Sequence, residues 1–589
     1  MVRMQHLNSR LEYFTPPQNA PSRRSGHSDP PYRLLVFLAV FLALPGYLVG
    51  VSSFPARILM GQDFDDGLYI RLGHHIANGH WLGTYNEFTL VKAPMFPVFL
   101  AAFYFTGIPF NIAQYCLFFL GCVYLGNIAS HICKSKVVGV VLFAAVLTCP
   151  SYYTITRVIR DPLYTSLTLF LVGSWIELFL LDRLKRNRLF FAAMVGILLA
   201  VYWLTREEGI WILPCLAIIS LGGFIGRLGG GSGELSKGSS SIFSRLLVMF
   251  LFASITAIGI GLLNKVVYGR FVLVEMTDGN FQRALVALQR VGAEYNRPYL
   301  PLPRDAREMV YSESASFAKL KNFLDPSDQS SRWINAACRP LPSTCGDIGG
   351  GWFLWAVRDA AAKAGIYESP EKAAAFYQSL ANEVEAACES GRLKCSAWVP
   401  PLMAAVPATQ WEKLPKTLLK TAGLILNIPP PKPPDVGPSD VRSPDMAEAL
   451  EFLNRPYLGG EGDPPETTSR LLMRTASLLV LKISTNIDRM VIVLGILSLV
   501  LAMGIWPRRA MASGVFLIIA ALTIALLTRC VLLALIEISS FPAVFHDRLL
   551  PAEPLAIASA FLSIYLFATL ACGARSRRSG NPRDYPGYS

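Results

Sequence analysis

Long apolar runs separated by short polar segments occupy most of this sequence. Helices are the expected form of these runs, because every backbone N–H and C=O inside lipid must find a partner within the protein. A helix needs about 20 apolar residues to cross the hydrocarbon core. The pattern predicts about ten transmembrane helices, at 34–53, 110–130, 137–151, 163–181, 189–204, 209–226, 246–267, 489–506, 511–536 and 553–573.

The apolar stretch 94–106 decides the topology. At about 13 residues it is short for a crossing and is typical of a re-entrant or interfacial helix. If it does not cross, the basic clusters between the spans all fall on the side of the N-terminal tail, as the positive-inside rule requires. If it crosses, the clusters from Lys134 to Arg188 fall on the opposite side. We therefore expect both termini in the cytoplasm.

This topology predicts an all-α polytopic membrane protein with an inserted, mainly helical domain outside the cytoplasm. Ser369 and Pro370 are typical of a helix start for the run that ends near Ala387. The expected parts are a disordered cytoplasmic tail at 1–33, a transmembrane core at 34–268 with a first outside loop at 54–93, the outside domain at 269–488, C-terminal transmembrane helices at 489–573 and a second cytoplasmic tail at 574–589.

Composition agrees with this class of protein. Of the 589 residues, 52% are hydrophobic and 16% are charged, which excludes an ordinary soluble globular protein. The formal charge of +13 reports topology first, because cytoplasmic loops of membrane proteins collect Lys and Arg. We expect membrane lipids as partners and no nucleic acid.

Four of the eleven cysteines lie in the outside domain, as the equally spaced pairs Cys338/Cys345 and Cys388/Cys395. They predict two local disulfides in an oxidising compartment. A zinc site is the rival interpretation, but the spacing fits no usual zinc pattern and neither loop holds a His. The domain also lacks an Asn-x-Ser/Thr acceptor, which favours a bacterial periplasm over an ER lumen and hence a bacterial inner membrane.

The first outside loop crowds three carboxylates, Asp63, Asp65 and Asp66, ahead of Tyr69, and it ends at Lys92 before the next apolar run. One interpretation is a solvated loop with an acidic helix start. The other is a general base or a metal site. The residues alone leave both open.

Three further polar elements fall on the same predicted face. The first holds Arg157, Arg160 and Asp161, although Asp161 followed by proline is also an ordinary helix start. The second holds Glu207 within a charged turn that is alternatively an interfacial anchor. The third runs from His546 to Arg548, and a guanidinium there suits a phosphate.

The order and placement of these four elements resemble the GT-C superfamily of polyprenyl-phosphate-sugar glycosyltransferases, which includes the lipid A aminoarabinose transferases and the protein O-mannosyltransferases. That family carries an acidic pair followed by Tyr after the first span, and a Lys/His-Pro-Pro-Leu element at the next apolar helix. Here the corresponding stretches are Asp65-Asp66-Gly67-Leu68-Tyr69 and Lys92-Ala93-Pro94-Met95, with Ala93 in place of the first proline. The resemblance covers about 34–226 and 546–554, and the domain at 269–488 matches no family.

The resemblance implies an inverting transfer of a sugar from a polyprenyl-phosphate donor to a hydroxyl of a glycan, lipid or protein on the periplasmic face. It implies that Asp65 is the general base, with Asp66 and Asp161 as further catalytic carboxylates. The remaining implied roles are donor phosphate binding by Lys92, Arg548 and Tyr69, and acceptor or supporting contacts by Arg157, Arg160, Glu207 and His546.

A need for a divalent metal stays open, with Asp63 and Asp65 as its ligands if one is used, and no other cofactor is expected. Two alternatives to the enzyme also stay open. One is a transporter or lipid flippase, although such folds usually show repeat symmetry and this sequence shows none. The other is a non-catalytic membrane subunit with a degenerate GT-C core.

Overall fold

The computed structural model describes residues 47–48, 64–154, 157–181, 187–228, 235–277, 279–327, 331–400, 405–426, 448–449, 451–453 and 468–579. Within these ranges the chain is helical and contains no β-strand. The predicted N-terminal tail and Asp63 lie outside the described residues, as does most of the predicted span 34–53.

Six helices in the described part of the chain are long and apolar enough to cross a membrane. Each overlaps a predicted span, so the structure supports an integral membrane protein. They are α5 (Phe110–Ile132), α8 (Asp161–Phe179), α11 (Leu235–Tyr268), α21 (Thr468–Ile505), α23 (Gly514–Ser539) and α25 (Glu553–Ser579).

Four shorter apolar stretches lie among these helices: α4 (Met95–Thr106), α6 (Lys136–Leu147), α9 (Arg188–Trp203), and η2 (Gly209–Ile212) with α10 (Leu213–Leu228). Helix α4 is the stretch predicted not to cross. The other three overlap predicted spans but are shorter than the six long helices, so the total of ten spans stays a prediction.

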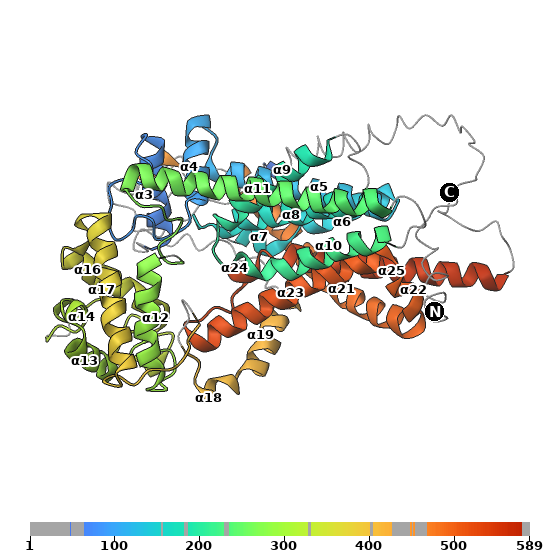
Figure 1. The fold of residues 1–589 in the computed structure, drawn as a ribbon. Helices are drawn as coiled ribbons and strands as arrows, with labels where there is room; N and C mark the ends of the chain where they lie inside the picture. Colours follow the sequence, from blue (N-terminus) through green and yellow to red (C-terminus); the bar gives the residue numbers. More distant parts are fainter. Residues whose placement is uncertain are drawn as a thin grey trace.

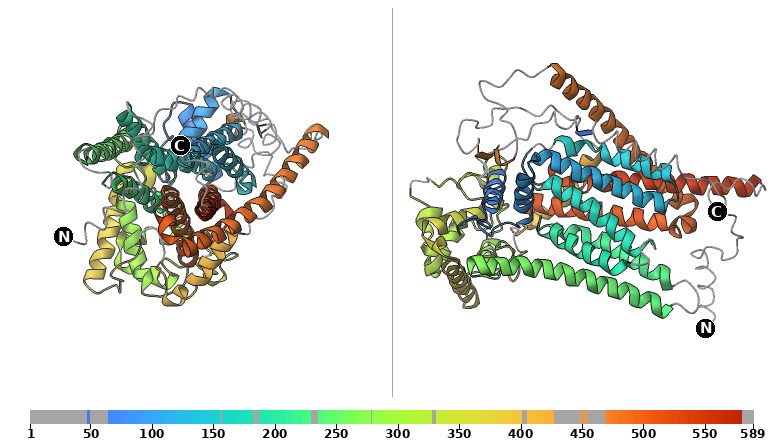
Figure 2. Two further views of the ribbon diagram at one scale, coloured as in Figure 1. Left: turned by 90° about the vertical axis from the view of Figure 1, so that its right-hand side faces the viewer. Right: turned by 90° about the horizontal axis from the view of Figure 1, so that it is seen from above.

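The long helices run roughly side by side, apart from α21, whose first half leans away from the bundle (Figures 1 and 2). Helix α8 lies inside the bundle, with nearly every residue buried, and it contacts α5, α9 and α10. Helix α25 packs on α21 and α23. Helices α5 and α6 approach each other so closely at Gly126 and Gly139 that a Cβ on Gly126 would lie 2.7 Å from the Gly139 carbonyl oxygen. Small residues allow such backbone contact between membrane helices.

Helix α21 begins at Thr468, whereas the apolar pattern predicts a start at 489. Its first turns carry Arg474 and Lys482 among apolar residues, and these charges interrupt the hydropathy signal. The helix therefore begins well before the predicted boundary between the inserted domain and the C-terminal transmembrane helices.

The segment 279–400, here named the outer domain, packs beyond one end of the bundle (Figure 1). Its main helices surround a separate buried core. Ser369 caps one of them as predicted, since its Oγ accepts a hydrogen bond of 3.2 Å from the Lys372 N–H and Pro370 is the first helical residue. The helices are α12 (Gly279–Ala293), α13 (Arg304–Glu313), α14 (Ala315–Ala318), α15 (Lys321–Leu324), α16 (Phe353–Lys363) and α17 (Pro370–Glu389).

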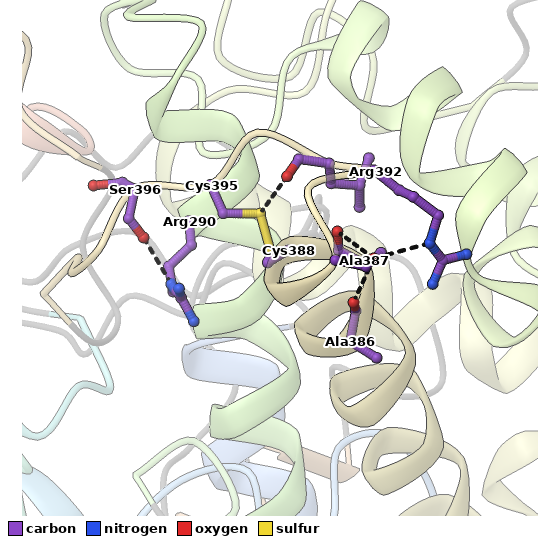
Figure 3. Close-up of a disulfide and its surroundings, with 9 residues drawn as sticks. Arg290, Ala386, Ala387, Cys388, Arg392, Cys395 and Ser396 are labelled. Atoms are coloured by element: carbon purple, nitrogen blue, oxygen red, sulfur yellow. Dashed lines mark hydrogen bonds between the residues drawn. A yellow bond between two sulfur atoms is a disulfide. The ribbon is translucent and has the colours of Figure 1, made fainter.

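The structure pairs the cysteines of the outer domain as the sequence predicts. The Cα atoms are 4.5 Å apart in Cys338–Cys345 and 5.6 Å apart in Cys388–Cys395. Figure 3 shows the second pair near the end of α17, beside a hydrogen bond of 2.8 Å from Arg290 Nε of α12 to the Ser396 carbonyl. This loop thereby fastens the end of α17 to α12.

Two helices follow the outer domain on the way back to the bundle, α18 (Ala408–Trp411) and α19 (Leu414–Leu426). Helix α19 packs on α23, the spanning helix nearest to it in Figure 1. Lys420 of α19 is paired with Glu537 near the end of α23, with Nζ 3.2 Å from Oε1. The outer domain is thus connected to the bundle by an element that contacts a membrane helix.

Candidate active site

An ion pair joins the two ends of the first outside loop. Asp65, which precedes α3 (Asp66–Ala77), has its Oδ1 2.6 Å from Lys92 Nζ. Lys92 also donates to the Phe64 carbonyl, and its Nζ lies 4.8 Å from the centre of the Tyr69 ring. The Lys92 side chain is buried, whereas 48% of the Asp65 side chain is exposed. The pair therefore combines a half-exposed carboxylate with a buried ammonium group.

The charges of this pair shift the pKa of both groups. The Lys92 ammonium lowers the pKa of Asp65 well below its usual value, against the opposing effect of burial. Burial disfavours the charged form of Lys92, but Tyr69 and Asp65 together raise its pKa above the ordinary value. Both groups are thus charged across the physiological pH range.

Asp66 is wholly buried at the first turn of α3 and faces a different partner. Its two oxygens accept from Arg157, at 2.5 Å from Nη2 and 3.3 Å from Nε. An acidic residue is also favourable at a helix N-terminus. These contacts hold the Asp66 carboxylate at the start of α3, next in the sequence to the half-exposed Asp65.

Glu207 fastens the Lys92 segment to the next charged elements. One of its oxygens lies 2.7 Å from Arg160 Nη1, and the other accepts the Ala93 backbone N–H at 2.9 Å. The family's proline at the position of Ala93 would have no such N–H. This departure from the motif therefore supplies a bond that holds the segment carrying Lys92.

Asp161 and the turn after α9 form a second group of ion pairs. Arg206 pairs with Asp161, and its Nε lies 3.2 Å from Glu208 Oε2. The same oxygen lies 3.1 Å from Nη1 of Arg529, a fully buried residue of α23. The sequence analysis missed Arg529, although a single Arg inside the apolar run 511–536 is the kind of residue that marks functional membrane sites.

Arg529 also holds the short helix α24 (His546–Leu549), because its Nε and Nη2 donate to the Arg548 carbonyl at 2.9 and 2.7 Å. The Arg548 guanidinium lies 4.8 Å from the centre of the Phe541 ring. Burial and the nearby Arg206 lower the pKa of Arg548. Within the described part of the chain, no ion pair to a carboxylate is formed by Arg548, so it is a cation available to an anionic ligand.

His546 and Asp547 take different positions on this short helix. His546 is turned toward the buried Glu553, with Nδ1 3.5 Å from Oε1. Partial burial of the Asp547 carboxyl group, together with the charge of Asp161, raises its pKa. The sequence element therefore contributes Arg548 to the charged cluster, while His546 supports the start of α25.

One wall of the site comes from the outer domain. The Phe64 ring lies 4.7 Å from the Trp355 ring and 5.1 Å from the Trp333 ring, measured between centres. Lys92 Nζ lies 5.7 Å from the centre of Trp355. The sequence analysis did not identify these tryptophans, because the domain that carries them matches no family motif.

The structure therefore connects all four sequence elements into one cluster at the end of the bundle that carries the outer domain. Its members are Asp65, Asp66, Tyr69, Lys92, Arg157, Arg160, Asp161, Arg206, Glu207, Glu208, Arg529 and Arg548. Among the described residues, no group of three metal-ligating side chains is present, and a need for a metal stays untested.

Comparison with known proteins gives little beyond this geometry. No family model matches the chain, and no curated protein matches it. Among solved structures, two crystal structures of ArnT from Cupriavidus metallidurans align with 94% of this chain at 13% identity. The one bound to undecaprenyl phosphate is covered over 82% of its length at a TM-score of 0.30, and the apo form over 81% at 0.27. At these TM-scores the two proteins are not shown to share a fold.

Proposed function

We propose that the protein is a membrane glycosyltransferase of the GT-C type, which moves a sugar from a polyprenyl-phosphate donor to a hydroxyl acceptor at the outer-domain end of the bundle. Asp65 is the general base in this proposal. Lys92 and Arg548 bind the phosphate of the donor, and the lipid chain lies among the apolar helices.

The distribution of ion-pair partners is the observation that carries the proposal. Five cations of the cluster each have a carboxylate partner, and Arg548 is the cation left without one among the described residues. The Arg548 side chain is partly buried and has carboxylates nearby but in no direct ion pair, so its guanidinium is free to form bidentate hydrogen bonds with a phosphate. The half-exposed Asp65 lies in the same cluster.

The chemistry follows from this arrangement. The acceptor hydroxyl oxygen attacks the anomeric carbon, and the bond from that carbon to the phosphate oxygen breaks with its electrons on the phosphate. The hydroxyl proton goes to Asp65, and attack opposite the leaving phosphate inverts the anomeric centre. Lys92 and Arg548 stabilise the negative charge that develops on the phosphate in the transition state.

The Asp65–Lys92 pair adds a step that depends on the donor. A carboxylate with so low a pKa is a weak base, because a base works best when its pKa lies near the working pH. When Lys92 turns toward the donor phosphate, Asp65 loses the charge that lowers its pKa, while burial still raises it. Asp65 therefore becomes a stronger base while the sugar donor is bound.

The test is transfer of radiolabelled sugar from polyprenyl-phosphate donors by the purified protein in lipid nanodiscs. We expect Asp65→Asn to reduce transfer by several orders of magnitude at equal protein and equal melting temperature. Asp305→Asn is the matched control, because Asp305 forms an exposed pair with Arg297 in the outer domain, and it should keep wild-type activity. Transfer unchanged by Asp65→Asn would contradict the assignment of the base, and no transfer from any donor would contradict the enzyme itself.

A further inference from the structure

Helix α19 carries two different exposed stripes beside its buried face. Its buried residues, Thr421 and Ile425, face the bundle. One exposed stripe, here named the apolar stripe, consists of Pro415, Leu419, Ala422 and Leu426. The other, here named the lysine stripe, consists of Lys416 and Lys420, with Lys413 in the turn just before the helix. At 3.6 residues per turn each stripe stays on one side of the helix.

The apolar stripe has exposed side chains. The side chains of Leu419 and Leu426 are 75% and 38% exposed, and Trp411, at the end of α18, is 49% exposed. No acidic residue lies between Leu414 and Leu426 in the sequence, and the acids close to the helix are Glu412 before it and Glu537 of α23, which pairs with Lys420. The helix therefore presents bare hydrocarbon on one side and net positive charge on the other.

The position of α19 beside α23 indicates which environment surrounds the two stripes. Lys420 is paired with Glu537, which lies two residues before the end of the spanning helix α23. Leu419 is adjacent to Lys420, so the apolar stripe lies at the level of the last turns of α23. Figure 1 shows α19 at the edge of the bundle beside the half of α23 that is nearer the outer domain.

We propose that α19 lies in the lipid–water interface of the leaflet next to the outer domain, with the apolar stripe among acyl chains and the lysine stripe against anionic headgroups. Basic amphipathic helices with leucine and tryptophan on the apolar side adopt this position. Trp411 lies where tryptophans of membrane proteins usually collect. This inference is independent of the proposed enzymatic function.

The test is a measurement of depth by spin labelling, in full-length protein whose exposed Cys572 and half-buried Cys116 are replaced by Ser. A nitroxide is attached to Leu419→Cys or, as a second position on the apolar stripe, to Ala422→Cys. Lys416→Cys on the lysine stripe is the matched control. In nanodiscs of equal parts phosphatidylglycerol and phosphatidylcholine, we expect collisions with oxygen to exceed those with a water-soluble nickel chelate at 419 and 422, and the reverse at 416.

The ratio of oxygen to nickel collisions should differ several-fold between the two stripes. If the labels at 419 and 422 collide with the nickel chelate as often as the label at 416, the interfacial position is wrong and the stripe is open to water or to a protein partner. In pure phosphatidylcholine the labels at 419 and 422 should report a shallower position. An equal depth in both lipid mixtures would contradict the role of the lysine stripe in binding anionic headgroups.

Discussion

The carboxylate of Asp65 lies 2.6 Å from the ammonium of Lys92, and the two residues come from opposite ends of the first outside loop. The lysine is covered by the Tyr69 ring and by Trp355, while the carboxylate stays half-exposed. The charged state of the proposed base is thus set by a residue 27 positions away in the sequence.

The pH dependence of transfer tests this relationship directly. Because Lys92 lowers the pKa of Asp65, the wild type keeps the active, ionised form far into the acidic range. In Lys92→Met the lowering charge is gone while burial still raises the pKa, so the acid limb of the kcat/KM profile should move upward by about 1 pH unit or more. Lys321→Met, which removes an exposed pair with Glu308, should leave the limb in place. An identical acid limb in Lys92→Met would show that Asp65 is not the titrating group.

Glu207 should act as a positioning residue with two separable contacts. Glu207→Gln keeps an oxygen for the Ala93 N–H but loses the charge that pairs with Arg160, whereas Glu207→Ala loses both. We expect transfer to fall about tenfold in the first variant and about a hundredfold in the second, because misplacement of Lys92 by about 1 Å is costly. Comparing kcat and KM for the donor is the measurement, and equal losses in the two variants would contradict a role for the Ala93 bond.

The outer domain contains a buried charge cluster that tests its stability. Arg307 is fully buried and pairs with Asp325 at 2.5 Å and with Asp347 at 2.6 Å. Arg307→Met leaves two buried carboxylates without this partner and should lower the free energy of unfolding by about 3–5 kcal/mol. Arg297→Met, at an exposed pair with Asp305 in the same domain, should cost less than about 1 kcal/mol. Denaturant titration in detergent solution compares the two, and similar losses would contradict this difference.

The same cluster predicts the direction of acid sensitivity. Burial raises the pKa of Asp325, but the hydrogen bonds and charge of Arg307 outweigh it, so the pKa lies below its ordinary value. A group whose pKa is lower in the folded state contributes stability above its unfolded pKa, and that contribution is lost as the pH falls. We therefore expect the outer domain to lose stability below about pH 4. A melting temperature that does not fall between pH 5 and pH 3 would contradict this contribution.

The two disulfides should be detectable without any activity. In protein prepared without reductant, Cys338, Cys345, Cys388 and Cys395 should resist a maleimide that modifies exposed Cys572, and they should react after reduction and denaturation. Loop-closure entropy for so short a loop predicts that Cys388→Ser with Cys395→Ser costs about 2 kcal/mol of stability. Intact-mass measurement after labelling is the readout, and modification of all four thiols without reductant would contradict the pairing.

The sequence predicted what depends on local pattern. Apolar runs predicted segments that overlap the six long helices, and the spacing of the cysteines predicted both pairs. Motif order singled out Asp65, Lys92 and Arg548, which the structure places in one charged cluster, and their roles stay a prediction. It could not predict which acid faces which base, because the pairs Arg157–Asp66 and Arg206–Asp161 join segments far apart in the chain. Trp355 was missed for the same reason, since its position over Lys92 depends on how the outer domain folds back on the first loop.

The contact between the outer domain and the first outside loop limits which truncated or chimeric proteins can keep this site intact. The Phe64 ring contacts Trp333 and Trp355, so the residue next to the proposed base is packed inside an interface with a domain that begins more than 200 residues later in the chain. A truncated protein without the outer domain would expose Phe64 and uncover Lys92 to water. Chimeras built to exchange acceptor preference would therefore need to take the first outside loop and the outer domain together from the same parent protein.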